Sequence, residues 1–329
     1  MKNFKNILLI NFGGIGDEIL FMPVLQVLKK QYPNCKITLC LEGRSKAFVN
    51  LCKYVDDYFC VDIKTKNKYL EMLKLYLKAL TGGYDFVISA GGSPLIAMML
   101  FFTGIKTRIG YKTSKLAEKL LTNAVPLNKN QYASKMYFDL VRPICDLEFE
   151  LPAIEVEVEN NLENSVLVHP GVSAMSVSKF ITKTFNGKTW AELIKQILKT
   201  GKNVYLVGGP DDTECICVIR EELKDIQAPN FHDLFGKTKN IFDLVKLIKQ
   251  SEVLVCSDSA PMHIGVAVNT KTIAVFGPTD DKKLLPESNK FFAVHNNANC
   301  RPCLWEKRQT TCNDLKCLDI PVEEIIKLL

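Results

Sequence analysis

The beginning of the chain alternates between strand and helix patterns, and this order limits the possible folds more than any other feature. An apolar run of strand length, a glycine-rich turn, a helical apolar period and a second apolar run follow one another as NILLINF, GGIGDE, ILFMPVLQVLKKQYP and CKITLCL. This order predicts a βαβ unit of a parallel sheet. Further expected strands and helices of the first half are YDFVISA, TRIGYK, 69–80 and 94–102.

The same alternation starts again in the second half. Residues 146–165 are acidic and lack a helical period, so we place a boundary there and predict domains 1–155 and 156–329. The expected strands are SVLVHPG, NVYLVGGPDD, EVLVCSD and TIAVFGP, and the expected helices are TWAELIKQILKTG and NIFDLVKLIKQS. A length of 329 residues suits two such domains. The predicted fold class is α/β, with two doubly wound parallel sheets facing a central cleft.

Polar groups follow each expected strand of the second half. They are 169–171, 208–212, 257–259 and 277–279. Ligands of open parallel sheets bind beyond the carboxyl ends of the strands. Pro261 suits the first turn of a helix, whose free N–H groups attract anions, so the pattern predicts a phosphate or nucleotide site. Taken alone, Ser259 could be a plain N-cap and His263 a core histidine.

The glycine turn of the first half matches a dinucleotide-binding fingerprint only in part. Gly14 and Gly16 fit the first two positions of G-x-G-x-x-G, but Ile19 stands at the third. Glu42 could serve as the ribose-binding acid, so an NAD-dependent oxidoreductase stays an alternative. Asp17 begins the first helix, whose dipole keeps a carboxylate ionised and suited to accepting a proton. The other interpretation of Asp17 is a helix-capping acid.

Charge is divided unevenly between the two halves. Residues 1–150 hold 21 Lys and Arg against 13 Asp and Glu, whereas the rest hold 21 against 23. The basic half predicts an anionic partner such as a phosphorylated lipid or a membrane surface, with a solvated basic face as the alternative. Nucleic acid is not expected, because no stacking or groove-reading motif accompanies these residues. We expect a cytoplasmic protein, since no secretory signal is visible and the apolar run 94–102 is too short to span a membrane.

Several stretches resemble a known family, in order along the chain. The chain resembles the bacterial heptosyltransferases of lipopolysaccharide core synthesis, which form glycosyltransferase family 9. The matching stretches are INFGGIGDEILFMPVLQVLKKQYPNCKITL, IKTRIGY, VLVHPG, VYLVGGPDD and SDSAPMHIGVAVNTKTIAVFGPTD. The resemblance implies a GT-B architecture, with the acceptor in the first Rossmann-like domain and the sugar nucleotide in the second. It also implies transfer with inversion at the anomeric carbon, without a metal or another required cofactor.

The resemblance assigns roles to single residues of this sequence. Asp17 corresponds to the acid of the family's G-D motif and would be the general base on the acceptor hydroxyl. Lys183 stands seven residues before Trp190, where the family has a Lys or Arg, and would hold the diphosphate. Asp212 corresponds to an acid that meets the nucleotide ribose. The donor-binding segment corresponds to Asp258, Ser259, Ala260, Met262 and His263.

Departures from the family pattern keep alternatives open. Relatives commonly have Trp-Pro after the basic residue, whereas this chain has Phe185 and Asn186, so Lys179 or Lys188 is an alternative diphosphate ligand. The motifs also do not specify the sugar. The expected donor is ADP-heptose, with another nucleotide sugar and a non-catalytic nucleotide- or glycan-binding protein as alternatives.

The expected acceptor is a lipopolysaccharide core or a related anionic cell-surface glycan at the cytoplasmic face of the inner membrane. The glycine turn would contribute Gly14 and Gly16 to its binding. The apolar segment that begins at Pro94 is a candidate membrane-facing element. Cations expected to meet the lipid phosphates are Lys106, Arg108, Lys112 and Lys115.

Four of the twelve cysteines cluster near the end of the chain. They are Cys300, Cys303, Cys312 and Cys317. Four thiols at this spacing suit a closed tetrahedral site for zinc or iron. Reduced thiols that pack the tail, or two disulfides in an oxidising compartment, are the alternatives. Any such metal would be structural, because the expected chemistry does not require it.

Overall fold

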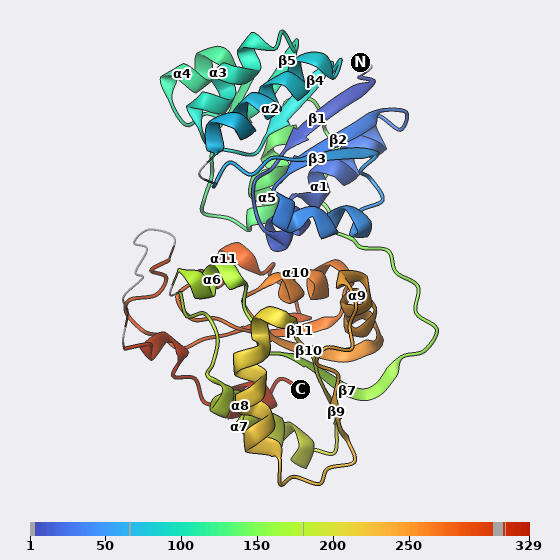
Figure 1. The fold of residues 1–329 in the computed structure, drawn as a ribbon, viewed down its shortest axis with the longest axis vertical. Coiled ribbons are helices and arrows are strands. Elements are labelled where there is room, and N and C mark those ends of the chain that lie inside the picture. Colours follow the sequence, from blue (N-terminus) through green and yellow to red (C-terminus); the bar gives the residue numbers. More distant parts are fainter. Residues whose placement is uncertain (1–3, 66, 180, 305–311, 313) are drawn as a thin grey trace. The chain divides into compact units, whose positions relative to one another are not determined.

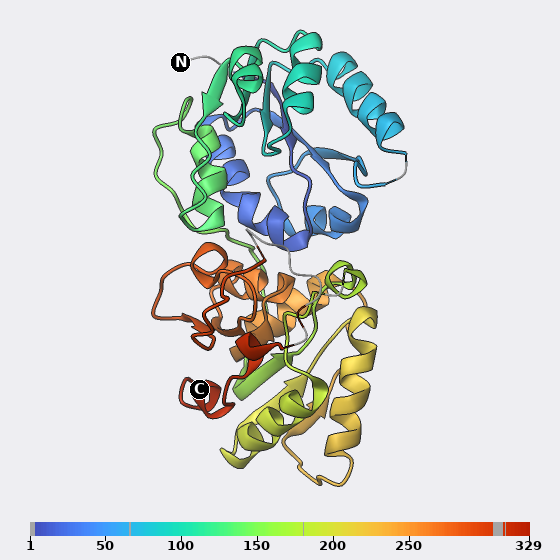
Figure 2. The same ribbon diagram turned by 90° about the vertical axis from the view of Figure 1, so that its left-hand side faces the viewer.

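The computed structural model describes residues 4–65, 67–179, 181–304, 312 and 314–329. The chain divides into two compact units, Met1–Ala153 and Ile154–Leu329. Each unit has its own parallel sheet (Figures 1 and 2). Each unit also has its own hydrophobic core.

The N-terminal unit contains a six-stranded parallel sheet in the order β3-β2-β1-β4-β5-β6. Its strands are β1 (Asn6–Ile10), β2 (Lys36–Leu41), β3 (Asp57–Cys60), β4 (Phe86–Ser89), β5 (Thr107–Tyr111) and β6 (Asn123–Val125). Its helices are α1 (Ile15–Gln31), α2 (Lys68–Thr81), α3 (Pro94–Phe102), α4 (Lys115–Leu120) and α5 (Ala133–Phe138), with the 3-10 turns η1 (Gly43–Leu51) and η2 (Asp139–Val141). The central strand β1 is buried almost throughout, because helices cover both faces of a parallel sheet, and its sequence is therefore continuously apolar.

The C-terminal unit contains a second six-stranded parallel sheet, in the order β12-β11-β10-β7-β8-β9. Its strands are β7 (Leu162–His169), β8 (Asn203–Leu206), β9 (Phe231–Asp233), β10 (Ser251–Ser257), β11 (Lys271–Val275) and β12 (Phe291–Val294). Its described helices are α6 (Ala174–Ser178), α7 (Gly187–Lys199), α8 (Thr213–Leu223), α9 (Ile241–Gln250), α10 (Ala260–Ala267), α11 (Asp281–Leu284) and α12 (Glu323–Ile326), with the turns η3 (Pro210–Asp212) and η4 (Lys316–Leu318).

Both sheets have the same strand order, counted within each unit. The order reverses between β1 and β4 in the first sheet, and between β7 and β10 in the second. All eight inner strands were expected from the sequence, whereas the four edge strands β3, β6, β9 and β12 were not. The prediction of two doubly wound parallel sheets is confirmed.

The apolar run 94–102 forms α3, which is nine residues long. Ile96 and Leu100 face the core of that unit, so the helix is only half buried. Among the residues that the structure describes, no helix is both long and apolar enough to cross a membrane.

Candidate functional site

The loop after β10 leads directly into α10, and this loop and the beginning of α10 together contain most of the predicted donor residues. Ser259 is the N-cap of α10, and Pro261 lies in its first turn. The first N–H groups of a helix have no partner within the helix. Met262 and His263 are buried, whereas Ser259 and Ala260 are partly exposed. Pro261 has no N–H and the Met262 N–H donates to the Ser259 carbonyl at 3.1 Å, so the accessible beginning of α10 attracts an anion chiefly through the positive end of the helix dipole.

Asp258, between β10 and α10, is bound by a lysine that is distant in the sequence. The Lys183 Nζ donates to the Asp258 carbonyl oxygen at 2.9 Å and to Oδ2 at 3.0 Å. The Thr279 hydroxyl donates to the same Oδ2 at 2.7 Å. Burial alone would raise the pKa of Asp258, but Lys183, Thr279 and His263 outweigh it, so the pKa is lowered. The structure thus brings the predicted residues Lys183, Asp258 and His263 together.

A second group of hydrogen bonds fixes the segment that carries Lys183. The Thr184 hydroxyl donates to the Pro170 carbonyl at 2.7 Å, and it accepts from the Trp190 indole at 2.9 Å. The Ser257 hydroxyl also donates to Thr184, at 2.8 Å. Trp190 is fully buried, so α7 anchors this segment to the core. No sequence pattern indicated this role of Thr184, because Ser257 lies 73 residues away.

Asp212, at the end of η3, is a buried acid held by backbone groups. Its Oδ2 accepts the N–H of Gly209 at 2.8 Å and lies 3.8 Å from the His169 Nε2. A Cβ at Gly171 would stand 1.8 Å from the Asp212 Oδ1, so the close approach requires glycine there. Burial raises the pKa of Asp212 and lowers that of His169, in both cases against their mutual attraction. The pair is therefore shifted toward its neutral forms.

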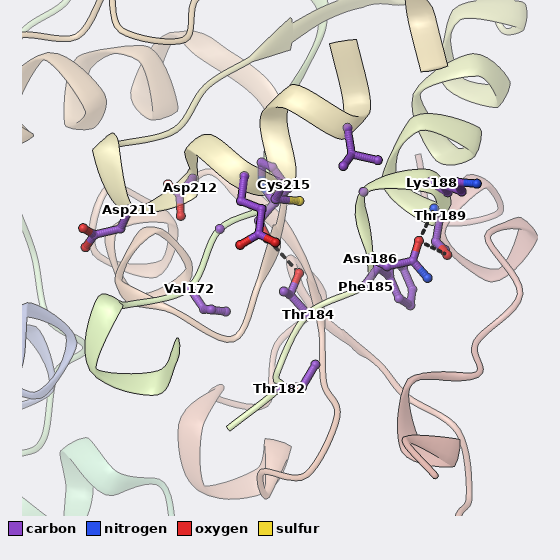
Figure 3. Close-up of a pocket in the computed structure, with 15 residues that line it drawn as sticks. Val172, Thr182, Thr184, Phe185, Asn186, Lys188, Thr189, Asp211, Asp212 and Cys215 are labelled. Atoms are coloured by element: carbon purple, nitrogen blue, oxygen red, sulfur yellow. Dashed lines mark hydrogen bonds between the residues drawn. The ribbon is translucent and has the colours of Figure 1, made fainter. Parts of the chain in front are cut away.

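A pocket with a volume of 710 Å³ opens beside Asp212 (Figure 3). Its wall comes from the loop after β7, the segment that leads into α7, and the start of α8. Figure 3 shows Asp211 and Asp212 on one side of the pocket and Lys188 and Thr189 on the other. Among the predicted donor residues, Asp212 lines this pocket, whereas Lys183 and the α10 segment are absent from its described lining. Thr184 links the two regions, because it lines the pocket and follows Lys183 directly.

Asp17 lies in the first turn of α1, which begins at Ile15 after the N-cap Gly14. Its Oδ2 accepts the N–H of Gly14 at 2.7 Å, so Asp17 does cap the helix. The carboxylate is nevertheless partly exposed. A Cβ at Gly13 would lie 2.3 Å from the Asp17 Cβ, so Gly13, which the fingerprint did not single out, makes room for Asp17. Gly16 is in the same turn of the helix.

Glu18, next to Asp17, is a fully buried carboxyl group that the sequence analysis missed. Neither of its oxygens has a hydrogen-bond partner among the described residues. Burial raises its pKa well above the ordinary value, and the neighbouring charges of Asp17 and Glu42 add to this, while Asn11 and Arg44 act in the opposite direction. Burial therefore favours the neutral, protonated form of Glu18.

Replacing Glu18 by glutamine is expected to stabilise the protein at neutral pH. The pKa of Glu18 is higher in the folded protein than its ordinary value of 4.5. The contribution of Glu18 to the free energy of unfolding is therefore fully present below about pH 4.5, and it is lost as the pH rises toward the pKa of the folded state. The stabilisation that Glu18→Gln adds to the free energy of unfolding should therefore grow by about 1.4 kcal/mol per pH unit between these two pKa values. Urea unfolding at several pH values measures it, with Glu148→Gln, at a side chain that is 89% exposed, as the control. A gain that is independent of pH would contradict the expectation.

Comparison with known proteins identifies the family. A sequence profile of glycosyltransferase family 9, described as heptosyltransferase, matches residues 72–313. The chain belongs to glycosyltransferase family 9. The resemblance seen in the sequence motifs is confirmed, and the protein is a glycosyltransferase.

Individual relatives of this family 9 glycosyltransferase cover nearly the whole chain. Lipooligosaccharide heptosyltransferase 2 of Haemophilus influenzae is 28% identical over an alignment of 310 residues that covers 87% of this chain and 87% of that protein. The structure of E. coli ADP-heptose lps heptosyltransferase II matches with a TM-score of 0.72 and 20% identity, covering 98% of each chain. E. coli heptosyltransferase WaaC with ADP matches with a TM-score of 0.70 and 16% identity, covering 98% of this chain and 100% of that one. These likenesses confirm the predicted GT-B fold.

Glu42, the basis of the dehydrogenase alternative, is not free to bind a ribose in this family 9 protein. Its buried carboxylate forms ion pairs of 2.6 Å with the Arg44 Nε and with the Lys64 Nζ. The dehydrogenase alternative is therefore not supported, since the family is a glycosyltransferase family and the proposed ribose ligand is already paired.

The three candidate lysines of the glycosyltransferase lie in different settings. Lys183 has a side chain that is 16% exposed and is bound to Asp258. Lys188 lines the pocket, is 78% exposed, and lies 3.9 Å from Glu222. Lys179 is partly buried next to α6. The contact with the donor segment favours Lys183 as the diphosphate ligand, which stays a prediction.

Arg108 of the N-terminal unit is held largely by its own unit. Its guanidinium donates to the carbonyls of Leu120 and Ile105, and it lies over the Phe101 ring at 5.3 Å from the centroid. Its expected contact with an acceptor phosphate stays a prediction, as do those of the exposed Lys106, Lys112 and Lys115.

The four clustered cysteines of the tail are free thiols. Burial and, to a lesser degree, the thiols of Cys300, Cys303 and Cys312 raise the pKa of Cys317 to about 11, so these side chains lie near one another. Within the described part of the chain, no group of three or more His, Cys, Asp or Glu is placed to hold a metal ion. Cys312 stands between residues that the structure does not describe, so the zinc or iron site stays a prediction.

Proposed function

We propose that the protein transfers a heptose from ADP-heptose to a lipopolysaccharide or lipooligosaccharide core, or to a related cell-surface glycan, with inversion at the anomeric carbon. Family membership and the names of the relatives support the sugar class. The observation that carries the proposal is the contact of Lys183 with Asp258 at the beginning of α10, because it places a cation beside the positive end of the α10 dipole, where a diphosphate can bind.

On the donor side, Lys183 and α10 would bind the diphosphate. An ammonium group has three N–H donors, of which Asp258 accepts two, so one remains for a phosphate oxygen. Negative charge develops on the diphosphate as its bond to the anomeric carbon breaks, and the fixed ammonium stabilises that charge. Asp212 would hold the ribose hydroxyl groups. In this proposal, the C-terminal domain, 156–329, binds the sugar nucleotide donor.

On the acceptor side, Asp17 would be the general base. Its Oδ2 is used by the Gly14 N–H, and its Oδ1 is left to accept a proton from the acceptor hydroxyl. The hydroxyl oxygen attacks the anomeric carbon from the side opposite the diphosphate, the new C–O bond forms as the old one breaks, and ADP leaves. The step needs no metal and no cofactor, because Asp17 takes the proton and Lys183 balances the charge. The N-terminal domain, 1–155, would hold the anionic acceptor at the cytoplasmic face of the inner membrane, with Gly14 and Gly16 nearby.

Calorimetric titration with ADP, UDP, GDP and NAD in parallel tests the donor. We expect selective binding of ADP, since the proposed donor carries adenosine diphosphate. Preference for UDP or GDP would keep the transferase class and reassign the sugar nucleotide. Tight binding of NAD with no binding of the others would contradict the proposed function. Turnover of ADP-heptose, followed as ADP release, is the second step once ADP binding is established.

A further inference from the structure

Helix α2 has two apolar faces, and only one of them packs on the sheet. Leu75 and Ala79 belong to the core of the N-terminal unit. The other face carries Tyr69, Leu70, Leu73, Leu77 and Leu80, which are between 45% and 74% exposed. Their spacing of three and four residues aligns them in one stripe along the helix. A stripe of large apolar side chains in water is unfavourable unless something covers it.

The neighbouring helices extend this exposed stripe. Leu95, Met98, Phe101 and Phe102 of α3 are between 38% and 65% exposed, and Leu116 of α4 is also exposed. Helix α3 contacts both α2 and α4, and Figure 1 shows the three helices next to one another. Ten of the fifteen large apolar side chains that are exposed among the described residues therefore lie on α2, α3 and α4. We name this region the α2–α4 surface.

The α2–α4 surface is also basic. Helices α2, α3 and α4 together hold five Lys against two Glu. Lys74 and Lys78 follow Leu73 and Leu77 directly, so they border the stripe of α2. Two copies of such a surface would repel each other, which disfavours self-association through it. Apolar side chains bordered by lysines suit a layer with an apolar interior and anionic headgroups.

We propose that the α2–α4 surface docks on an anionic lipid bilayer. The leucine and phenylalanine side chains enter the interface between headgroups and acyl chains, and the lysines contact lipid phosphates. The docking rests on the proposed function only in that the acceptor is a lipid-linked glycan, and it is independent of which sugar is transferred. It places the N-terminal unit at the membrane without needing a spanning helix, and none is present in the part of the chain that the structure describes.

Flotation of the purified full chain with vesicles tests this docking. We expect binding to vesicles of phosphatidylethanolamine and phosphatidylglycerol, weakened by added salt, and much weaker binding to phosphatidylcholine vesicles. The triple variant Leu70→Gln/Leu73→Gln/Leu77→Gln should lower binding at least tenfold. These side chains are exposed, so the fold should persist, which unfolding curves check.

A matched control removes exposed apolar side chains elsewhere. The variant Leu147→Gln/Leu151→Gln/Ile226→Gln should bind the vesicles as the parent does. ADP affinity should be the same in all three proteins, so a failure of nucleotide binding is distinguished from a failure of docking. Equal binding to neutral and anionic vesicles, or an unaffected α2 variant, would overturn the proposal. So would a concentration-dependent dimer that only the α2 variant abolishes, because the surface would then be a subunit interface.

Discussion

Asp17→Asn is expected to lower the turnover of heptosyl transfer by about 10²- to 10⁴-fold, the usual contribution of a positioned general base. Asparagine has the size of aspartate, and its side-chain oxygen can still accept the N–H of Gly14, which the carboxylate accepts at 2.7 Å. The helix cap is therefore kept, while the proton acceptor is lost. The measurement is the rate of ADP release at saturating ADP-heptose.

Two further measurements separate the base from the cap. Asp17→Ala removes both, so it should match Asp17→Asn in turnover but unfold at lower urea, by about 1 kcal/mol for a lost cap. ADP affinity should be unchanged in both variants, because Asp17 belongs to the N-terminal unit and the donor residues to the other. An asparagine variant with near-normal turnover would leave Asp17 only its capping role.

Lys183→Ala is expected to weaken ADP binding by about 10- to 100-fold, which corresponds to the loss of one charge-assisted hydrogen bond to a phosphate. The same change leaves the buried carboxylate of Asp258 without its cation. Breaking a buried ion pair from one side costs about 3–5 kcal/mol of stability, so weaker binding could reflect partial unfolding.

The double variant Lys183→Ala/Asp258→Asn resolves this ambiguity. Neutralising both partners should restore most of the stability, whereas ADP binding should stay weak if Lys183 contacts the phosphate. Lys188→Ala is the matched control, since its side chain is 78% exposed and should leave both quantities unchanged. Recovery of ADP affinity in the double variant would show that Lys183 only neutralises Asp258. Loss of affinity in Lys188→Ala alone would move the phosphate contact to the pocket.

The sequence predicted the inner strands and missed the edges for a physical reason. An inner strand such as β10 pairs on both sides and is buried on both faces, so it has a continuous apolar run. The edge strands β3 and β9 pair on one side only, are three or four residues long, and are partly exposed. Their sequences DYFC and FHD therefore resemble those of loops.

Residues of the candidate site could be predicted where they belong to a local sequence motif. Contacts between residues that are distant in the sequence could not be predicted. Motif resemblance identified Lys183 and Asp258 separately, but a contact across 75 residues has no signature in a single sequence. The burial of Glu18 was hidden as well, because a charged residue beside Asp17 at a helix start is indistinguishable from a solvated acid. Likewise, the apolar run of α3 was visible, whereas the second apolar face of α2 emerged only when its first face was placed on the sheet.

The shared strand order has a consequence for how such a chain can diversify. Asp17 follows β1 and Asp258 follows β10, both of which are central strands at the point where the order reverses. The loops after the edge strands β3, β6, β9 and β12 are remote from these acids in the order of their sheets. Lengthening a surface loop costs little free energy, because closure entropy grows slowly with length. Insertions at these margins could therefore alter which glycan is bound, while the two acids keep their positions at the centres of their sheets.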